Sequence, residues 1–115
     1  MTLSDGTVRE KIEGAKEVQN LKIDYKKENS VLYCAVTGRI DTISAPALLE
    51  VFENNYDGIT GITVDAEKLE YISSAGLRVL LMAVKKAGQG TVINASDAVK
   101  EIFETTGFDQ IIDVR

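Results

Sequence analysis

Strand-type and helix-type patterns alternate along this chain, and the alternation limits the folds open to it. Three stretches carry apolar residues at helical spacing, and each follows a short run rich in β-favouring residues. A helix between two strands joins them in parallel, because the chain must cross back over the sheet before it enters the next strand. The order β-β-α-β-α-β-α-(β) predicts a single α/β domain, with helices packed on a mixed sheet.

The predicted strands differ in how much of their surface is apolar. Residues 21–28, LKIDYKKE, alternate apolar and charged positions, which predicts a half-exposed edge strand. Residues 31–40, VLYCAVTGRI, are apolar on both faces, which predicts a more central strand paired with the first as a hairpin. Short strands are predicted at 62–69 (ITVDAEKL) and 91–95 (TVINA), and 111–115 (IIDVR) can add a last one.

The three predicted helices each have a capping residue and a stripe that faces the core. The first begins near Ser44, with Pro46 in its first turn, where the missing N–H costs nothing. The second begins at Ser73 or Ser74, and the third at Ser96. Their apolar stripes are Ala45, Leu48, Leu49 and Phe52; Leu77, Leu80, Leu81 and Val84; and Val99, Ile102, Phe103 and Thr106.

The first twenty residues hold few apolar positions, and these are spread too widely for a firm stripe. We expect a polar N-terminal arm over 1–20, weakly helical or disordered, followed by one domain over 21–115. The longest apolar run, residues 79–84, is too short to cross a bilayer, and the N-terminus lacks the apolar centre of a secretory signal. We therefore expect a cytoplasmic protein without membrane insertion.

Composition excludes several classes of function. The chain has no histidine, which removes the commonest general base and the commonest metal ligand. Its single cysteine, Cys34, excludes an internal disulfide and is expected to fill space in a buried strand. A net charge of -5 disfavours nucleic acid, because phosphate binding needs a basic surface. We expect no cofactor, no metal ion and a protein as the partner.

Two adjacent serines, Ser73 and Ser74, precede Ala75 and Gly76 at the start of the second predicted helix. One serine is enough for an N-cap, in which the hydroxyl accepts from a free N–H of the first turn. The small residues that follow leave the helix start open, which favours docking of a partner. A helix N-terminus also tolerates an anion, so a phosphate on one serine would not unfold the helix.

Two other interpretations of this region are weaker. A Ser-x-Gly before a helix resembles half of a nucleophile elbow, but Ile72 replaces the first glycine of that motif and no histidine is present to act as base. Asp41 and Asp65 each stand at or just past the end of a predicted strand and could bind a cation as a pair. A solvated turn or a helix-cap carboxylate is the plainer explanation for each, and Arg39 is expected to be a surface residue.

Three segments, TGRID, ISSAGLRVLL and SDAVKEIFETTGF, resemble the STAS domain, and within that family the bacterial anti-sigma-factor antagonists. The resemblance covers about residues 21–115. It implies a protein without enzymatic activity that binds an anti-sigma factor, usually a serine kinase, and thereby releases a sigma factor. It also implies that phosphorylation by this kinase breaks the complex and that a separate serine phosphatase restores it.

The resemblance assigns roles to individual residues. Ser74 matches the modified serine of the family, whereas the best-known members have aspartate where this chain has Ser73, so Ser73 is either a second acceptor or only the cap. Asp41 matches the acidic residue in the loop after the second strand. The expected partner-binding residues are Asp41, Thr42, Ser73, Ser74, Ala75, Gly76 and Arg78. The alternative is a STAS adaptor subunit of a membrane transporter or signalling complex, in which no phosphorylation occurs and both serines only cap.

Overall fold

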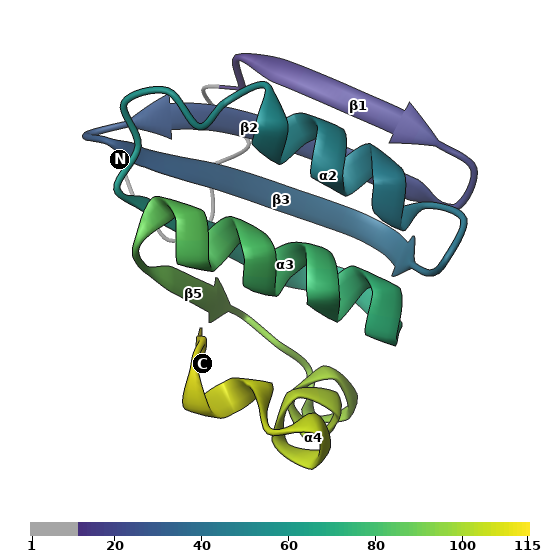
Figure 1. The fold of residues 1–115 in the computed structure, drawn as a ribbon. Helices are drawn as coiled ribbons and strands as arrows, with labels where there is room; N and C mark the ends of the chain where they lie inside the picture. The colour runs from purple at the N-terminus through teal and green to yellow at the C-terminus, as the bar shows by residue number, and fades with distance from the viewer. Residues whose placement is uncertain (1–11) are drawn as a thin grey trace, which may run out of the picture.

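One mixed sheet of six strands, in the order β1-β2-β3-β4-β5-β6, organises the protein, as a computed structural model that describes residues 12–115 shows (Figure 1). The strands are β1 (Gly14–Val18), β2 (Leu21–Glu28), β3 (Val31–Ile40), β4 (Gly61–Ile72), β5 (Gly90–Ile93) and β6 (Asp113–Val114). The helices are α2 (Ala45–Glu53), α3 (Ser74–Ala87), α4 (Asp97–Thr106) and the 3-10 helix η1 (Phe108–Gln110). This arrangement confirms the predicted α/β class. None of the helices in residues 12–115 is both long and apolar enough to span a membrane.

Strand β1 lies where the sequence predicted a polar arm or a weak helix. It pairs antiparallel with β2, with Gly14 opposite Tyr25 and Val18 opposite Leu21. The prediction is therefore wrong for Gly14–Val18, and LKIDYKKE is an inner strand rather than an edge strand; residues 1–11 of the predicted arm lie outside the described residues. The segment GAKEV was missed because its order comes from pairing with β2 and not from an apolar stripe of its own.

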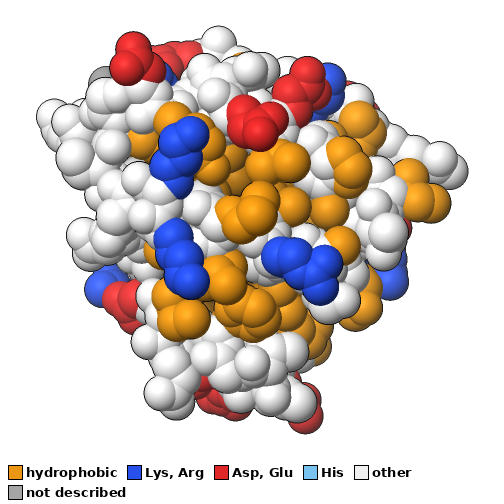
Figure 2. All heavy atoms as spheres, viewed as in Figure 1, with side chains coloured by type: hydrophobic (Ala, Val, Ile, Leu, Met, Phe, Trp, Pro, Cys, Tyr) orange, Lys and Arg blue, Asp and Glu red, His pale blue; other side chains and the backbone are white. Residues whose placement is uncertain are grey.

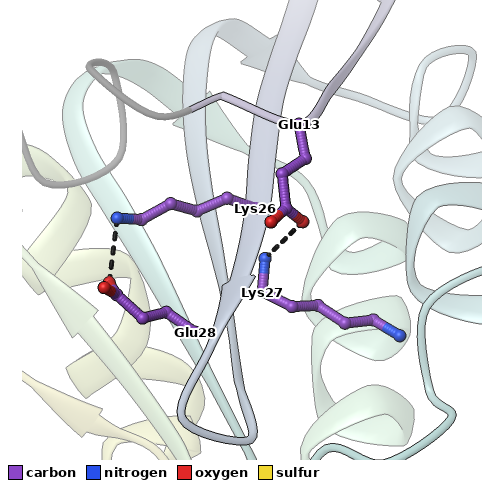
Figure 3. Close-up of polar contacts among 4 residues, drawn as sticks. All are labelled: Glu13, Lys26, Lys27 and Glu28. Atoms are coloured by element: carbon purple, nitrogen blue, oxygen red, sulfur yellow. Dashed lines mark hydrogen bonds and ion pairs between the residues drawn. The ribbon is translucent and has the colours of Figure 1, made fainter.

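Side chains near the β1–β2 pair reinforce the backbone ladder. The carboxylate of Glu13 accepts a hydrogen bond of 3.0 Å from the backbone N–H of Lys27 (Figure 3). Lys26 and Lys27 project to opposite sides of β2, as alternation in a strand requires. Lys26 is buried, and its ammonium group pairs with Glu28 at 3.0 Å. The charged face of β2 is thus partly covered rather than uniformly exposed.

The strands that are joined by helices run parallel, as predicted: β3 with β4, β4 with β5, and β5 with β6. Strand β4 is much longer than expected, because it continues beside β3 until Ile72 lies opposite Ile40. Two shifts of register along this pair break the simple alternation of β4, and the second half of the strand carries several charges. The predicted strand therefore ended too early, at residue 69. Asp65 therefore lies within the strand and not at its end.

Helices α2 and α3 lie side by side across one face of the sheet, and α4 lies at the end of the sheet away from β1 (Figure 1). Their predicted stripes are largely buried, and Phe52, Leu77 and Phe103 are among the largest fully buried side chains. Cys34 is also fully buried, as expected for a space-filling residue, and burial raises the pKa of its thiol to about 12. This packing holds the ends of α2 and α3 in fixed positions on the sheet.

Candidate functional site

The carboxyl ends of β3 and β4 place two loops next to each other. Ile40 and Ile72 are register partners and are the last residues of their strands. The backbone N–H of Ser73 donates a hydrogen bond of 2.7 Å to the carbonyl oxygen of Ile40. The loop of residues 41–44 and the start of α3 therefore leave the sheet side by side, and we refer to residues 41–44 and 73–76 as the rim.

The two serines of the rim have different surroundings. Ser73 is the N-cap of α3: its backbone is extended (φ -84°, ψ 172°), and its hydroxyl oxygen accepts from the N–H of Gly76 at 3.2 Å. Only 9% of Ser73 is exposed, whereas Ser74, the first residue of α3, is exposed. The capping hydroxyl is thus engaged and largely covered, and the second serine is accessible to another protein.

The start of α3 offers backbone N–H groups as hydrogen-bond donors close to the Ser74 side chain. The first turn of this helix contains no acidic residue. Within the described part of the chain, the structure gives no hydrogen-bond acceptor to the N–H groups of Ser74 and Ala75, while those of Gly76 and Leu77 bond to Ser73. Free N–H groups and the positive end of the helix dipole favour an anion at this position.

Gly76 does not keep the helix start open, and that expectation is wrong. The residue is buried against the sheet. A β-carbon at this position would lie 2.5 Å from Cγ2 of Ile40 and 2.8 Å from Cγ1 of Ile72. The glycine is therefore needed for the close approach of α3 to the ends of β3 and β4, and its small size serves packing rather than access by a partner.

Asp41 orders the loop that precedes α2. One carboxylate oxygen accepts hydrogen bonds from the backbone N–H of Ile43 (3.0 Å), the backbone N–H of Ser44 (2.9 Å) and the hydroxyl of Ser44 (3.0 Å). The backbone and side-chain hydrogen bonds from Ser44 are the main reasons that the pKa of Asp41 is lowered below its ordinary value. Asp41 is therefore charged at neutral pH, and its hydrogen bonds tie together the loop that begins beside Ser73.

A groove of about 240 Å³ runs between α2 and α3, next to the rim. Figure 2 shows hydrophobic side chains gathered over these two helices, with basic side chains among them and acidic side chains along one border. The groove is lined by Thr42, Ala45, Pro46, Leu49, Ala75, Arg78, Val79 and Met82. Thr42, Ala75 and Arg78, which were expected to bind a partner, therefore belong to one continuous surface.

Sequence reasoning missed the apolar part of this surface. Ile43, in the loop before α2, is 80% exposed, and Met82 on α3 is 48% exposed. Signals for both were available: Ile43 is an apolar residue inside a polar loop, and Met82 lies outside the core-facing stripe of its helix. Met82 lines the groove, and Ile43 follows Thr42, another lining residue. Exposed large apolar side chains at such a groove are typical of protein-binding surfaces.

Asp65 is not part of the rim. It lies seven residues before Ile72 along β4, on the order of 20 Å from the end of the strand. It is buried, and its carboxylate accepts from the N–H of Glu67 and from the side-chain amide of Asn94, both at 3.1 Å. The cation site suggested for Asp41 and Asp65 is therefore wrong, and residues 12–115 contain no group of three or more side chains placed to hold a metal ion.

Comparison with known proteins identifies the family. The sequence pattern of the STAS domain matches residues 22–115, which is most of the chain. The protein belongs to the STAS domain family. The anti-sigma-B factor antagonist of Bacillus subtilis (strain 168) is 27% identical to this STAS protein over 99 residues, which cover 83% of this chain and 91% of that relative.

Solved structures of two anti-sigma factor antagonists share the fold. An anti-sigma factor antagonist from Mycobacterium paratuberculosis superposes with a TM-score of 0.71 and 21% identity, covering 86% of this chain and 89% of that one. The anti-sigma factor antagonist SpoIIAA in its unphosphorylated form superposes with a TM-score of 0.67 and 17% identity, covering 81% of this chain and 87% of that one. The family resemblance noted in the sequence and the predicted fold class are both confirmed.

Proposed function

We propose that this STAS protein is an anti-sigma-factor antagonist that is controlled by phosphorylation of Ser74. In its unmodified form it binds an anti-sigma factor that has serine kinase activity and so frees the sigma factor held by that protein. The kinase transfers the γ-phosphoryl group of ATP to the Oγ of Ser74; the hydroxyl proton is lost and ADP leaves. A separate serine phosphatase hydrolyses the phosphate ester and restores binding.

The observation that carries this proposal is the difference between the two serines. Ser73 is engaged as the cap of α3, and Ser74 is exposed at the first position of the same helix, beside the groove. A kinase can reach Ser74 without disturbing the cap. The paired serines thus have separate roles: Ser73 supports the helix, and Ser74 accepts the phosphate.

The same site explains how a phosphate would end the interaction. Phosphorylation adds about -1.5 to -2 charges and three oxygen atoms at Ser74. The helix tolerates this charge because of the free N–H groups of its first turn. A partner packed against the rim does not tolerate this charge, because binding would remove water from the phosphate. The negative charge of Asp41 in the same rim adds to this cost. Loss of binding then requires no refolding of the STAS domain.

In this role the chain itself binds a partner and does not catalyse a reaction. The chain contributes no histidine as a base, and the hydroxyl oxygen of Ser73 is occupied by the N–H of Gly76. All phosphoryl chemistry is assigned to the partner kinase and to the phosphatase. The Bacillus subtilis relative and the structural neighbour SpoIIAA are both named as anti-sigma factor antagonists, which supports a binding role.

The test is a capture experiment with three tagged proteins: the wild type, Ser74→Asp and Ser73→Ala. Proteins retained from a lysate of the source cell are identified by mass spectrometry, and ATP is then added to the retained complexes. We expect a serine kinase to be retained by the wild type and by Ser73→Ala and lost with Ser74→Asp. Addition of ATP should place one phosphate on Ser74 and release the kinase.

Two results would contradict the proposal. Equal recovery of a membrane transporter subunit by all three proteins would favour the adaptor alternative, in which the serines only cap α3. Phosphate on Ser73 instead of Ser74 would show that the capping serine is the acceptor. A Ser74→Ala protein serves as the matched control, since it should bind the kinase permanently and take up no phosphate.

A further inference from the structure

Ser74 and Arg78 lie four residues apart on α3 and are both exposed. Residues four apart on a helix are neighbours on its surface, with about 5–6 Å between their Cβ atoms. An acidic group placed N-terminal to a basic one at this spacing has the more favourable of the two orientations. A phosphate on Ser74 would therefore stand within reach of the guanidinium group of Arg78.

Among residues 12–115, no other group holds Arg78 in the unmodified protein. Within residues 12–115 the structure assigns no hydrogen bond, ion pair or ring contact to its side chain. Helix α3 has no acidic residue, and the positions three and four residues from Arg78 are Ser74, Ala75, Leu81 and Met82. With respect to residues 12–115, the helix thus contains an unpaired cation, and a phosphorylated Ser74 would give it an anionic partner on the same face.

The other arginine close to the rim is in a different situation. The guanidinium carbon of Arg39 lies 4.6 Å from the ring centroid of Tyr71, its neighbour across the β3–β4 pair. This stacking stabilises Arg39 in one position at the end of the sheet. Arg39 already has a partner in the ring of Tyr71. An Arg39→Gln substitution is therefore a suitable control, because it removes a cation near the rim that is not free to bind a phosphate on Ser74.

We propose that Arg78 links phosphorylation of Ser74 to the binding of the anti-sigma factor, because its guanidinium group leaves an acidic group of that protein and pairs with the phosphate instead. In the unmodified protein Arg78 lines the groove between α2 and α3, where it pairs with an acidic side chain of the bound anti-sigma factor. When Ser74 is phosphorylated, the phosphate captures the guanidinium group and withdraws it from the groove. Phosphorylation then acts twice, because it adds an anion to the interface and removes a cation from it.

Arginine suits this role better than lysine. Its planar guanidinium group donates two parallel hydrogen bonds to a carboxylate or to a phosphate, so it can exchange one for the other with similar geometry. The phosphate carries more charge than a carboxylate and is attached to the same helix, so the intrahelical pair is favoured once it is available. This inference rests on the proposed function, since it assumes that Ser74 is the phosphorylated residue.

The first experiment needs no partner. Phosphoserine is introduced at position 74 by genetic code expansion, and the phosphate is titrated by phosphorus NMR in the wild type, Arg78→Gln and Arg39→Gln. An ordinary phosphoserine loses its second proton near pH 6. We expect the midpoint in Arg78→Gln to be about 0.4 pH units higher than in the wild type. Arg39→Gln should match the wild type, and the difference should shrink in about 1 M salt.

An unchanged midpoint in Arg78→Gln would overturn the capture by phosphate. A shift of equal size in Arg39→Gln would also overturn it, because the effect would then reflect general charge at the rim. Arg78 is exposed, so the unmodified Arg78→Gln protein should unfold at the wild-type temperature, and the titration can be interpreted without a change of fold.

The second experiment measures the affinity of the unmodified proteins for the captured kinase. Arg78→Gln should bind about tenfold more weakly than the wild type, and Lys85→Gln, on the same helix outside the groove, should bind equally well. Equal affinity of Arg78→Gln and the wild type would overturn the role of Arg78 in docking. If phosphorylated wild type binds the kinase as tightly as the unmodified protein, the proposed function fails, whereas the titration still decides whether the phosphate captures Arg78.

Discussion

Gly76 and Ile40 are so close that a β-carbon on the glycine would lie 2.5 Å from Cγ2 of the isoleucine. This contact fixes the start of α3 against the end of β3. The position of Ser74 at the rim therefore depends on a glycine two residues later that never faces the solvent. A packing contact in the core thus determines what is presented at the surface.

The first prediction tests this contact. Gly76→Ala should destabilise the protein by about 1–3 kcal/mol, because the added methyl group must displace Ile40 or the helix. Urea unfolding gives the free-energy change. A double-mutant cycle with Ile40→Ala provides the control: the two substitutions together should cost less than the sum of their separate costs, because the smaller side chain makes room for the methyl group. Strict additivity would contradict the steric explanation.

The second prediction separates the two serines by stability. Ser73→Ala removes the cap of α3 and should lower the free energy of unfolding by about 1 kcal/mol. Ser74→Ala should change it by less than about 0.5 kcal/mol, since Ser74 is exposed and has no capping role. Ser73→Asp is the matched control, because aspartate also caps helices and should keep most of the stability. Equal losses in the two alanine variants would contradict the assignment of the cap.

The third prediction concerns the pH dependence of the loop before α2. Hydrogen bonds from Ser44 and Ile43 lower the pKa of Asp41, so the folded protein keeps this carboxylate charged to a lower pH than the unfolded chain does. Its contribution to stability is complete above the pKa of the unfolded chain, and it is lost as the pH falls through the lower pKa of the folded protein. The NMR shift of the Ser44 amide should therefore report a midpoint below the ordinary value of 3.8.

Two variants check the origin of that titration. Asp41→Asn keeps an oxygen acceptor but has no titrating proton, so the acid transition of the Ser44 amide should disappear. Asp57→Asn, which alters an exposed aspartate in another loop, should leave the transition in place. A transition that survives in Asp41→Asn would mean that another group titrates against the Ser44 amide.

The sequence was sufficient for most of the fold because the central elements carry strong local patterns. Strand β3 is apolar on both faces, and α3 combines a capping serine with a regular stripe and a left-handed glycine, Gly88, at its end. Strand β1 and the second half of β4 were missed because their order depends on pairing with a neighbour. Pairing of this kind is a tertiary effect, and a local pattern does not report it.

The site was predictable to a similar degree. Adjacent loops at the ends of parallel strands brought Asp41 to the serines, as the fold class implied. The sequence did not distinguish the environments of Ser73 and Ser74, because both residues suit an N-cap and only the start of α3 decides which one is covered. The sequence also placed Gly76 at the surface, because its close approach to Ile40 and Ile72 arises only when α3 packs on the sheet.

The last prediction concerns the apolar groove. Met82→Glu should weaken binding of the captured kinase at least about tenfold, because it places an unpaired charge where the partner is expected to bury apolar surface. It should change the free energy of unfolding by less than about 0.5 kcal/mol, since the side chain is already half exposed. Titration calorimetry and urea unfolding measure the two quantities separately.

Ile111→Glu is the matched control for this variant. Ile111 is 51% exposed, similar to Met82, but it follows η1 near the C-terminus and does not line the groove. The two substitutions add the same charge to apolar positions of similar exposure. A difference between their affinities for the kinase therefore reports the effect of where the charge lies. Equal weakening by both would indicate that the partner responds to net charge. Undiminished binding of Met82→Glu would remove the groove from the interface and restrict docking to the rim.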